Sequence, residues 1–172
     1  MLASRQPQSS FSPPENQALE PDLPVVFLSR KVAEALPGTP GMAIISITNP
    51  GKRLADLPGY LPTQVLRLSF DDADELAMGL PFCLDPVAAP LSGLPAWVWS
   101  GIEWFSPRQA EAIRVFVERQ SLDTRFRVHC EKGQSRSAAV ARWIAGYRKL
   151  PEPPGISIPN GRVLRVLQQV SG

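Results

Sequence analysis

The stretch VHCEKGQSRSAAVARWIAGY (128–147) decides how the rest of the chain is interpreted. The run 125–129, which overlaps its beginning, predicts a β-strand, and the alanine-rich run 137–149 predicts a helix with an apolar side. Between them lies a short loop that starts at Cys130 and ends at Arg136. Ligands of open α/β sheets bind beyond the carboxyl ends of the strands, where such a loop is found. The stretch therefore predicts a ligand-binding junction between a strand and a helix.

The remaining sequence alternates between predicted strands and predicted helices. Short apolar runs rich in β-branched residues predict strands at 24–29, 41–48 and 63–70. Helical spacing and capping residues predict helices at 30–36, at 106–120 with Ser106 as the N-cap, and at 161–170 with Asn160 as the N-cap. This alternation favours an α/β fold with a central, mainly parallel sheet flanked by helices.

The length of 172 residues suits one domain with a substantial core. Residues 1–22 are rich in Ser, Pro and Gln and are expected to be disordered, because they bury too little apolar surface to offset their ordering entropy. A single domain is therefore predicted at 23–172. Within it, the Pro- and Gly-rich stretch 76–105 is predicted to be an insertion with one short aromatic helix.

The composition argues against several classes of function. The net charge of +2 is too close to neutral to attract nucleic acid in bulk, and no apolar run is long enough to span a membrane. One histidine and two cysteines do not complete a structural zinc site, so neither a metal nor another cofactor is expected. Two cysteines also make no disulfide framework, which favours a reducing compartment such as the cytoplasm. The oligomeric state is left open.

The loop from Cys130 to Arg136 has the composition of an anion-binding site. Backbone N–H groups converge where a loop enters a helix, and the helix dipole adds positive potential. Gly133 permits a positive φ and a close backbone approach, and Arg136 supplies a planar fork that holds two phosphate oxygens at once. The same donors stabilise a thiolate, so the pKa of Cys130 is expected to lie below the usual value of about 8.5. One loop would thus bind a phosphate-like dianion and ionise the nucleophile that attacks it.

The segment HCEKGQSRS (129–137) resembles the signature loop of the cysteine-based protein tyrosine phosphatases. That signature reads His-Cys, two residues, Gly, two residues, Arg and Ser or Thr, and this chain matches it at His129, Cys130, Gly133, Arg136 and Ser137. The resemblance extends loosely over 25–149. The short chain and the late position of the loop look like the dual-specificity branch or one of its small bacterial relatives. The resemblance implies the fold of that superfamily and a cysteine-dependent phosphoric monoester hydrolase.

The resemblance also implies a role for each residue of the loop. Cys130 would attack phosphorus and form a phosphocysteine intermediate, and Ser137 would hydrogen-bond the sulfur and help it to leave in the second step. His129 would orient the loop from behind. The phosphate oxygens would be bound by the loop itself, that is by Glu131, Lys132, Gly133, Gln134, Ser135 and Arg136.

The family takes the proton for the leaving group from an aspartate on a mobile loop, usually at the end of an Ile-Pro-x-x-Asp strand. LSFDD (68–72) resembles that strand end and makes Asp72 the candidate general acid. The spacing to the nucleophile is longer than usual in the family, which requires the stretch 76–105 to be an insertion. A solvated acidic turn would also explain this acidic run, and the alternative acids are Asp71, Asp74 and Glu103.

The variable positions of the loop bear on the substrate. Phosphoinositide phosphatases of this superfamily often carry a Lys directly after the glycine, where this chain has Gln134, and Lys132 is the basic residue that remains. This favours phosphotyrosine or another simple monoester, in a phosphorylated protein or a small molecule. A second hypothesis is a pseudophosphatase that binds phosphorylated ligands without turnover. The insertion contains four aromatic residues: Trp97, Trp99, Trp104 and Phe105. They either line the substrate pocket or pack the insertion onto the sheet.

Overall fold

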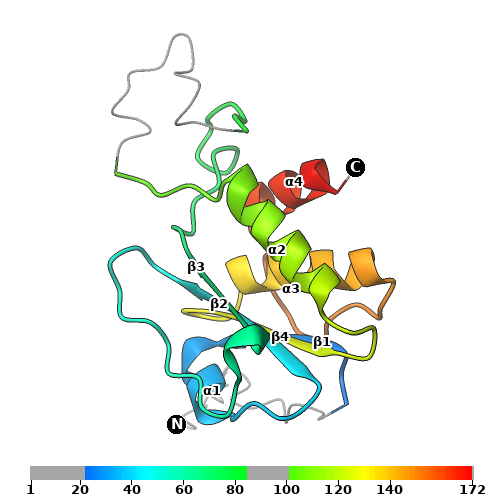
Figure 1. Cartoon of the computed structure of the whole chain (residues 1–172). Coiled ribbons are helices and arrows are strands. Elements are labelled where there is room, and N and C mark those ends of the chain that lie inside the picture. Colours follow the sequence, from blue (N-terminus) through cyan, green and yellow to red (C-terminus); the bar gives the residue numbers. More distant parts are fainter. Residues whose placement is uncertain (1–21, 85–100, 172) are drawn as a thin grey trace, which may run out of the picture.

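A computed structural model describes residues 22–84 and 101–171, and its centre is a four-stranded sheet in which all neighbouring strands are parallel. The strand order is β1-β4-β2-β3 (Figure 1). The strands are β1 (Val25–Ser29), β2 (Met42–Thr48), β3 (Val65–Ser69) and β4 (Arg125–Cys130). The helices are α1 (Arg30–Ala35), the short 3₁₀ turn η1 (Pro62–Gln64), α2 (Pro107–Arg119), α3 (Arg136–Arg148) and α4 (Gly161–Val170). The predicted α/β fold with a mainly parallel sheet flanked by helices is therefore confirmed.

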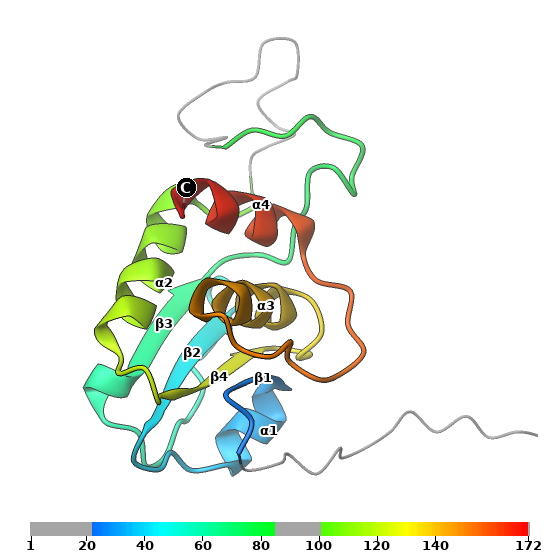
Figure 2. The same cartoon turned by 90° about the vertical axis from the view of Figure 1, so that its right-hand side faces the viewer.

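The two faces of the sheet are covered by different elements. On one face, alternate strand residues such as Ile45, Phe126 and Val128 pack into the main core against α2 and α3, with α4 behind them. On the other face, Val26, Leu28 and Ile44 pack against α1 and the loop that follows β2. Figure 2 shows α3 between the sheet and α4. Because β2 is covered on both faces, all seven of its residues are buried, as its continuous apolar sequence predicts.

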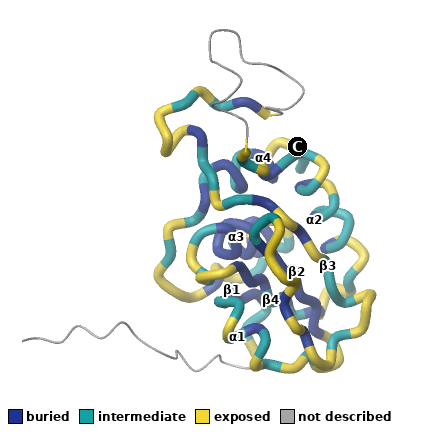
Figure 3. The backbone as a smooth tube through the Cα atoms, turned by 90° about the vertical axis from the view of Figure 1, so that its left-hand side faces the viewer, coloured by how far each residue is buried: buried dark blue, intermediate teal, exposed yellow. Residues whose placement is uncertain are grey.

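Helix α3 is buried around almost its whole circumference at its N-terminal end. Its residues from Arg136 to Ala141 are all buried, because the sheet lies on one side of the helix and α4 on the other (Figure 3). Trp143 and Tyr147 both belong to the predicted apolar side of this helix. Trp143 is buried as expected, whereas Tyr147, near the C-terminal end, is 37% exposed. Its ring stacks on Trp143 and its hydroxyl donates to Glu118 on α2. Tyr147 therefore lies at the edge of the core rather than inside it.

The N-caps predicted for α2 and α4, Ser106 and Asn160, are present in the structure. The Ser106 hydroxyl accepts from the N–H of Gln109, and the Gln109 side chain in turn accepts from the N–H of Ser106, which together form a capping box at the start of α2. The Asn160 side chain accepts from the N–H of Val163 at the start of α4. Both helices begin where these caps predict, because the first N–H groups of a helix need acceptors outside it.

Two predicted segments fall largely outside the described residues. The segment 1–22, apart from its last residue, is not described, and neither is 85–100 of the predicted insertion. The described flanks of that insertion, 76–84 and 101–105, contain turns and irregular chain. The domain boundaries therefore stay predictions. Within the described residues, no helix is both long enough and apolar enough to cross a bilayer.

Candidate active site

The parallel register brings the carboxyl ends of the strands to one edge of the sheet. Ser29 at the end of β1 pairs with Cys130 at the end of β4, and Ser46 of β2 pairs with His129. The loop from Cys130 to Arg136 leaves this edge and leads directly into α3. The predicted strand–loop–helix junction is thus present, at the edge of the sheet where α/β proteins bind ligands.

The Cys130 thiol lies at the base of this loop and is 2% exposed. Its Sγ is 3.1 Å from the hydroxyl oxygen of Ser137, in the first turn of α3. Burial raises the pKa of the thiol, but hydrogen bonds from the Ser137 hydroxyl and from the backbone N–H groups of Ser137, Gly133 and Gln134 outweigh burial and lower it. The groups that converge on the sulfur therefore favour a thiolate, as the sequence predicts.

Gly133 lets the loop pack directly on the end of β1. Its φ is +70°, and a Cβ built on it would lie 2.3 Å from the backbone nitrogen of Ser29 and 2.6 Å from the carbonyl oxygen of Leu28. A side chain would meet main-chain atoms of the sheet, which do not move aside as a flexible side chain does. Glycine at this position therefore fixes both the conformation of the loop and its contact with the sheet.

The Arg136 guanidinium uses its Nη1 donor in a hydrogen bond within the protein, whereas its Nε donor has no acceptor among the described residues. The side chain is buried, and Nη1 donates to the carbonyl oxygen of Phe70 at 2.7 Å. Its Nε is also buried, and among the described residues it has no hydrogen-bond partner. Native proteins rarely leave a buried N–H group without an acceptor. This donor beside the loop is available to an anionic ligand.

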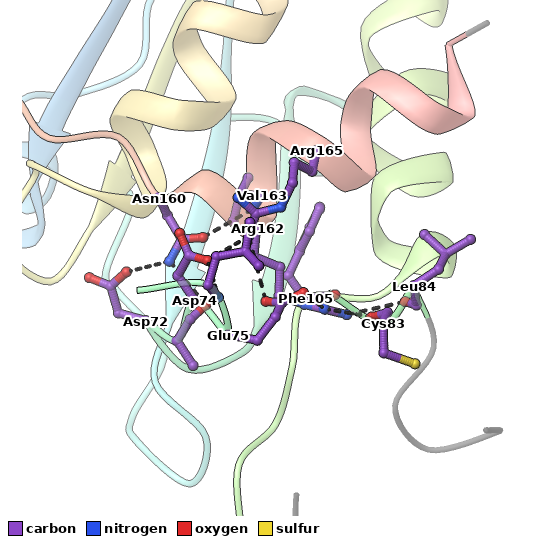
Figure 4. A network of polar contacts seen from close by, with 12 residues as sticks. Asp72, Asp74, Glu75, Cys83, Leu84, Phe105, Asn160, Arg162, Val163 and Arg165 are labelled. Atoms are coloured by element: carbon purple, nitrogen blue, oxygen red, sulfur yellow. Dashed lines mark hydrogen bonds and ion pairs between the residues drawn. The ribbon is translucent and has the colours of Figure 1, made fainter. Parts of the chain in front are cut away.

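Asp72, which is remote in sequence, lies next to this loop. Its Oδ1 accepts from the Ser135 hydroxyl at 2.7 Å and from the Asn160 amide at 2.9 Å, and its Oδ2 lies 4.0 Å from Nε of Arg136. The side chain is 40% exposed, so it is accessible to a ligand and to solvent. Figure 4 shows Asp72 facing Asn160, which precedes α4. Asp72 is thus hydrogen-bonded directly to the loop, and its role as the general acid stays a prediction.

The alternative acids make other contacts. The Asp71 carboxylate accepts from the N–H of Glu103 at 2.9 Å, and the N–H of Asp71 donates to the carbonyl oxygen of Glu103 at 2.8 Å. These two hydrogen bonds give Asp71 and Glu103 a structural role, because they link two segments that are distant in the chain. Asp74 pairs with Arg165 of α4. Burial raises the pKa of Asp74, but the Arg165 guanidinium and backbone N–H groups lower it overall, which is unsuitable for a proton donor.

The variable positions of the loop face solvent. Glu131, Lys132 and Gln134 are all exposed. Glu131 is tied to α1: its carbonyl oxygen accepts from the N–H of Arg30 at 3.3 Å, and its carboxylate lies 3.8 Å from the Arg30 guanidinium. Arg30 therefore offsets the negative charge that Glu131 adds to the loop. No local sequence signal places Arg30 near the loop, because its proximity to the loop depends on the pairing of β1 with β4.

His129 immediately precedes Cys130 in β4, and its role in orienting the loop stays a prediction. Its side chain is fully buried, and Nε2 is 2.8 Å from the hydroxyl of Ser46 on the neighbouring strand. Burial is the main cause that lowers the pKa of His129 to about 4. The ring is consequently neutral near pH 7 and serves as a structural link between β4 and β2.

The described aromatic residues of the predicted insertion pack into the protein. Trp104 is 7% exposed and its ring lies 5.2 Å from the guanidinium carbon of Arg162, while Phe105 is 1% exposed with its ring centroid 4.8 Å from that of Phe70. These contacts favour the packing alternative for both residues. Trp97 and Trp99 lie outside the described residues. In the described ranges, no three His, Cys, Asp or Glu side chains gather as a metal site would require.

The lowered pKa of Cys130 predicts unusual reactivity towards iodoacetamide. In a Cys83→Ser variant, where Cys130 is the only thiol, alkylation is expected to reach half of its maximal rate below about pH 8.5, because the thiolate is the nucleophile. Inorganic phosphate should slow this reaction by covering the sulfur. The pH dependence of the alkylation rate, measured by mass spectrometry against a cysteine peptide, checks both effects. A midpoint equal to that of the peptide, with no protection by phosphate, would contradict this assignment.

No protein-family model, curated protein or solved structure matches this chain. The functional interpretation consequently depends on the residues described above and on their geometry.

Proposed function

We propose that this protein is a phosphoric monoester hydrolase that acts through a phosphocysteine intermediate, of the protein tyrosine phosphatase type. The observation that carries the proposal is the combination of Cys130 and Arg136. A buried thiol with a lowered pKa lies at the base of a loop whose N–H groups converge, beside a buried guanidinium Nε that lacks an acceptor among the described residues. Together these groups suit an in-line attack on a bound phosphoryl group.

The proposed reaction has two steps. In the first, the Cys130 thiolate attacks phosphorus, the bond from phosphorus to the ester oxygen breaks, and protonated Asp72 gives its proton to the departing oxygen. In the second, water attacks the phosphocysteine while the Asp72 carboxylate takes a proton from it, and the sulfur leaves as a thiolate. The Ser137 hydroxyl, 3.1 Å from Sγ, stabilises that thiolate. The products are the free alcohol or phenol and inorganic phosphate.

The proposed substrate class is a simple monoester, phosphotyrosine or another aryl or alkyl phosphate, in a protein or a small molecule. The exposed Glu131, Lys132 and Gln134 add no net charge around the loop. Arg30 is engaged by Glu34 at 3.0 Å as well as by Glu131. A highly phosphorylated ring would require more unpaired cations than these residues supply.

Hydrolysis of para-nitrophenyl phosphate tests the proposal. The wild-type protein should release para-nitrophenol and be inhibited by vanadate, and Cys130→Ser should reduce kcat by at least about 10,000-fold, because removing a nucleophile abolishes the covalent route. Cys83→Ser is the matched control: the other cysteine is 9% exposed, and the variant should keep most of the activity.

Three outcomes are informative. Activity that survives in Cys130→Ser would contradict the phosphocysteine route. A wild-type protein that binds vanadate or a phosphotyrosine peptide without turnover would favour the pseudophosphatase alternative. Absence of both turnover and vanadate binding would reject the anion site itself.

A further inference from the structure

The N-terminal part of α4 and its cap make several polar contacts with residues 72–75, the segment that carries Asp72 (Figure 4). The Asn160 amide nitrogen donates to Oδ1 of Asp72 at 2.9 Å and to the carbonyl oxygen of Ala73 at 3.2 Å. Arg165 pairs with Asp74 one turn further along the helix. The residues 72–75 are thus held through both side-chain and backbone atoms, by a helix that follows them by more than 80 residues.

The firmest of these attachments is a buried ion pair. Glu75 and Arg162 are both fully buried, and Oε1 of Glu75 lies 2.7 Å from Nη1 of Arg162. The same guanidinium donates to three carbonyl oxygens at 2.9–3.1 Å, those of Phe105, Cys83 and Leu84. A buried charge with this many partners has little freedom to move, because each lost hydrogen bond would leave a group desolvated and unpaired. The end of the segment at Glu75, three residues from Asp72, is therefore fixed.

Asn160 connects this anchored segment to the loop from Cys130 to Arg136, which is the proposed phosphate loop. Its side chain is 5% exposed, and its Oδ1 accepts from the N–H of Val163 as the cap of α4. Its own N–H donates to the carbonyl oxygen of Ser135 at 3.2 Å, and Ser135 in turn donates its hydroxyl to Asp72. One buried residue therefore touches the loop, the helix and the candidate acid, and each of its polar groups has a defined partner.

We propose that Asn160 is a positioning residue that holds Asp72 over the phosphate loop for transfer of the leaving-group proton. This inference rests on the proposed function and adds to it a residue outside the signature loop. Asp72 is 40% exposed, and within the described ranges its hydrogen bonds come from Ser135 and Asn160. Loss of the Asn160 amide would leave one of these two donors and free the Asp72 carboxylate to turn away. General acid catalysis depends on this geometry, since the donor must lie within hydrogen-bond reach of the departing oxygen.

The test uses Asn160→Ser, because serine still caps a helix but is too short to reach Asp72 as the amide does. On phosphotyrosine, whose leaving group needs a proton, the variant should lower kcat by about 10- to 100-fold, part of the contribution of a general acid. On 2,4-dinitrophenyl phosphate, whose leaving group needs none, the change should stay within about threefold. Asp72→Asn should show the same selectivity more strongly. The double variant should be no slower on phosphotyrosine than Asp72→Asn alone, because both changes remove one function.

Ser106→Ala is the matched control for the cap, because it removes an N-cap from α2, where the cap does not touch Asp72. It should lower the midpoint of urea unfolding slightly and leave the ratio of the two kcat values unchanged. Equal slowing of both substrates by Asn160→Ser, or additive effects with Asp72→Asn, would overturn the inference.

Hydrogen exchange gives a readout that needs no turnover. The amides of Leu76, Met78 and Leu80, which donate to Asp74 and Glu75, should exchange faster in Asn160→Ser than in Ser106→Ala, and equal protection in the two variants would also overturn the inference. A wild-type protein without Cys130-dependent hydrolysis would reject the proposed function instead, while the exchange experiment would still decide whether Asn160 holds the segment.

Discussion

Gly133→Ala is expected to destabilise the protein by about 2–5 kcal/mol and to abolish binding of vanadate to the loop. The residue has φ +70°, which costs a residue with a Cβ about 1–2 kcal/mol. The added methyl group would also lie 2.3 Å from the nitrogen of Ser29 and 2.4 Å from the carbonyl carbon of Leu28. Overpacking of this kind costs about 1–3 kcal/mol more, and here the loop itself has to move away from β1 to relieve it.

Gly51→Ala separates the two causes. Gly51 has nearly the same φ, +69°, but an added Cβ would have no heavy atom within 4 Å. This control should therefore lose only about 1–2 kcal/mol and keep its affinity for vanadate. Urea unfolding followed by circular dichroism measures the free energy of unfolding of both variants. Equal losses in the two would show that the contact of the loop with β1 contributes nothing.

Arg162→Met is expected to destabilise the protein by about 3–5 kcal/mol, because it leaves the fully buried Glu75 without its closest cation. The carbonyl oxygens of Phe105, Cys83 and Leu84 lose their donor in the same step. Arg165, whose guanidinium is 3.7 Å from the other carboxylate oxygen of Glu75, replaces only part of the lost interaction. Unfolding in urea should show a lower midpoint.

Arg142→Met provides the comparison for this ion pair. Arg142 of α3 pairs with Glu152 at 3.0 Å, but these side chains are 31% and 67% exposed. Solvent screens such a pair, so its removal should cost no more than about 1 kcal/mol. If Arg162→Met were as mild as Arg142→Met, the buried pair would not anchor the segment 72–75 to α4.

Some features of the candidate site follow from local sequence. The positions of Cys130 and Arg136, at the end of a strand and the start of a helix, were predicted because apolar periodicity and the Gly-containing loop are both encoded within about twenty neighbouring residues. The caps Ser106 and Asn160 were predicted for the same reason, since a helix end depends on a side chain only a few residues away.

Other features required the tertiary structure. The acidic run 71–75 offered several equivalent carboxylates, and the sequence could only favour Asp72 by analogy. In the folded chain its members diverge: Asp71 bonds the backbone of Glu103, Asp74 and Glu75 pair with α4, and Asp72 faces the loop. Likewise, Asn160 was predicted only as a cap, and no sequence signal pairs it with a residue so distant along the chain.

The sequence by itself thus determined the α/β class and the loop from Cys130 to Arg136 between a strand and a helix, because these depend on interactions between near neighbours along the chain. Only the tertiary structure decided the strand order β1-β4-β2-β3, the carboxylate beside Arg136 and the attachment of that carboxylate to α4. The reason is physical: contacts between distant segments depend on how the strands pair and which helices cover them, and local propensity carries no information about either.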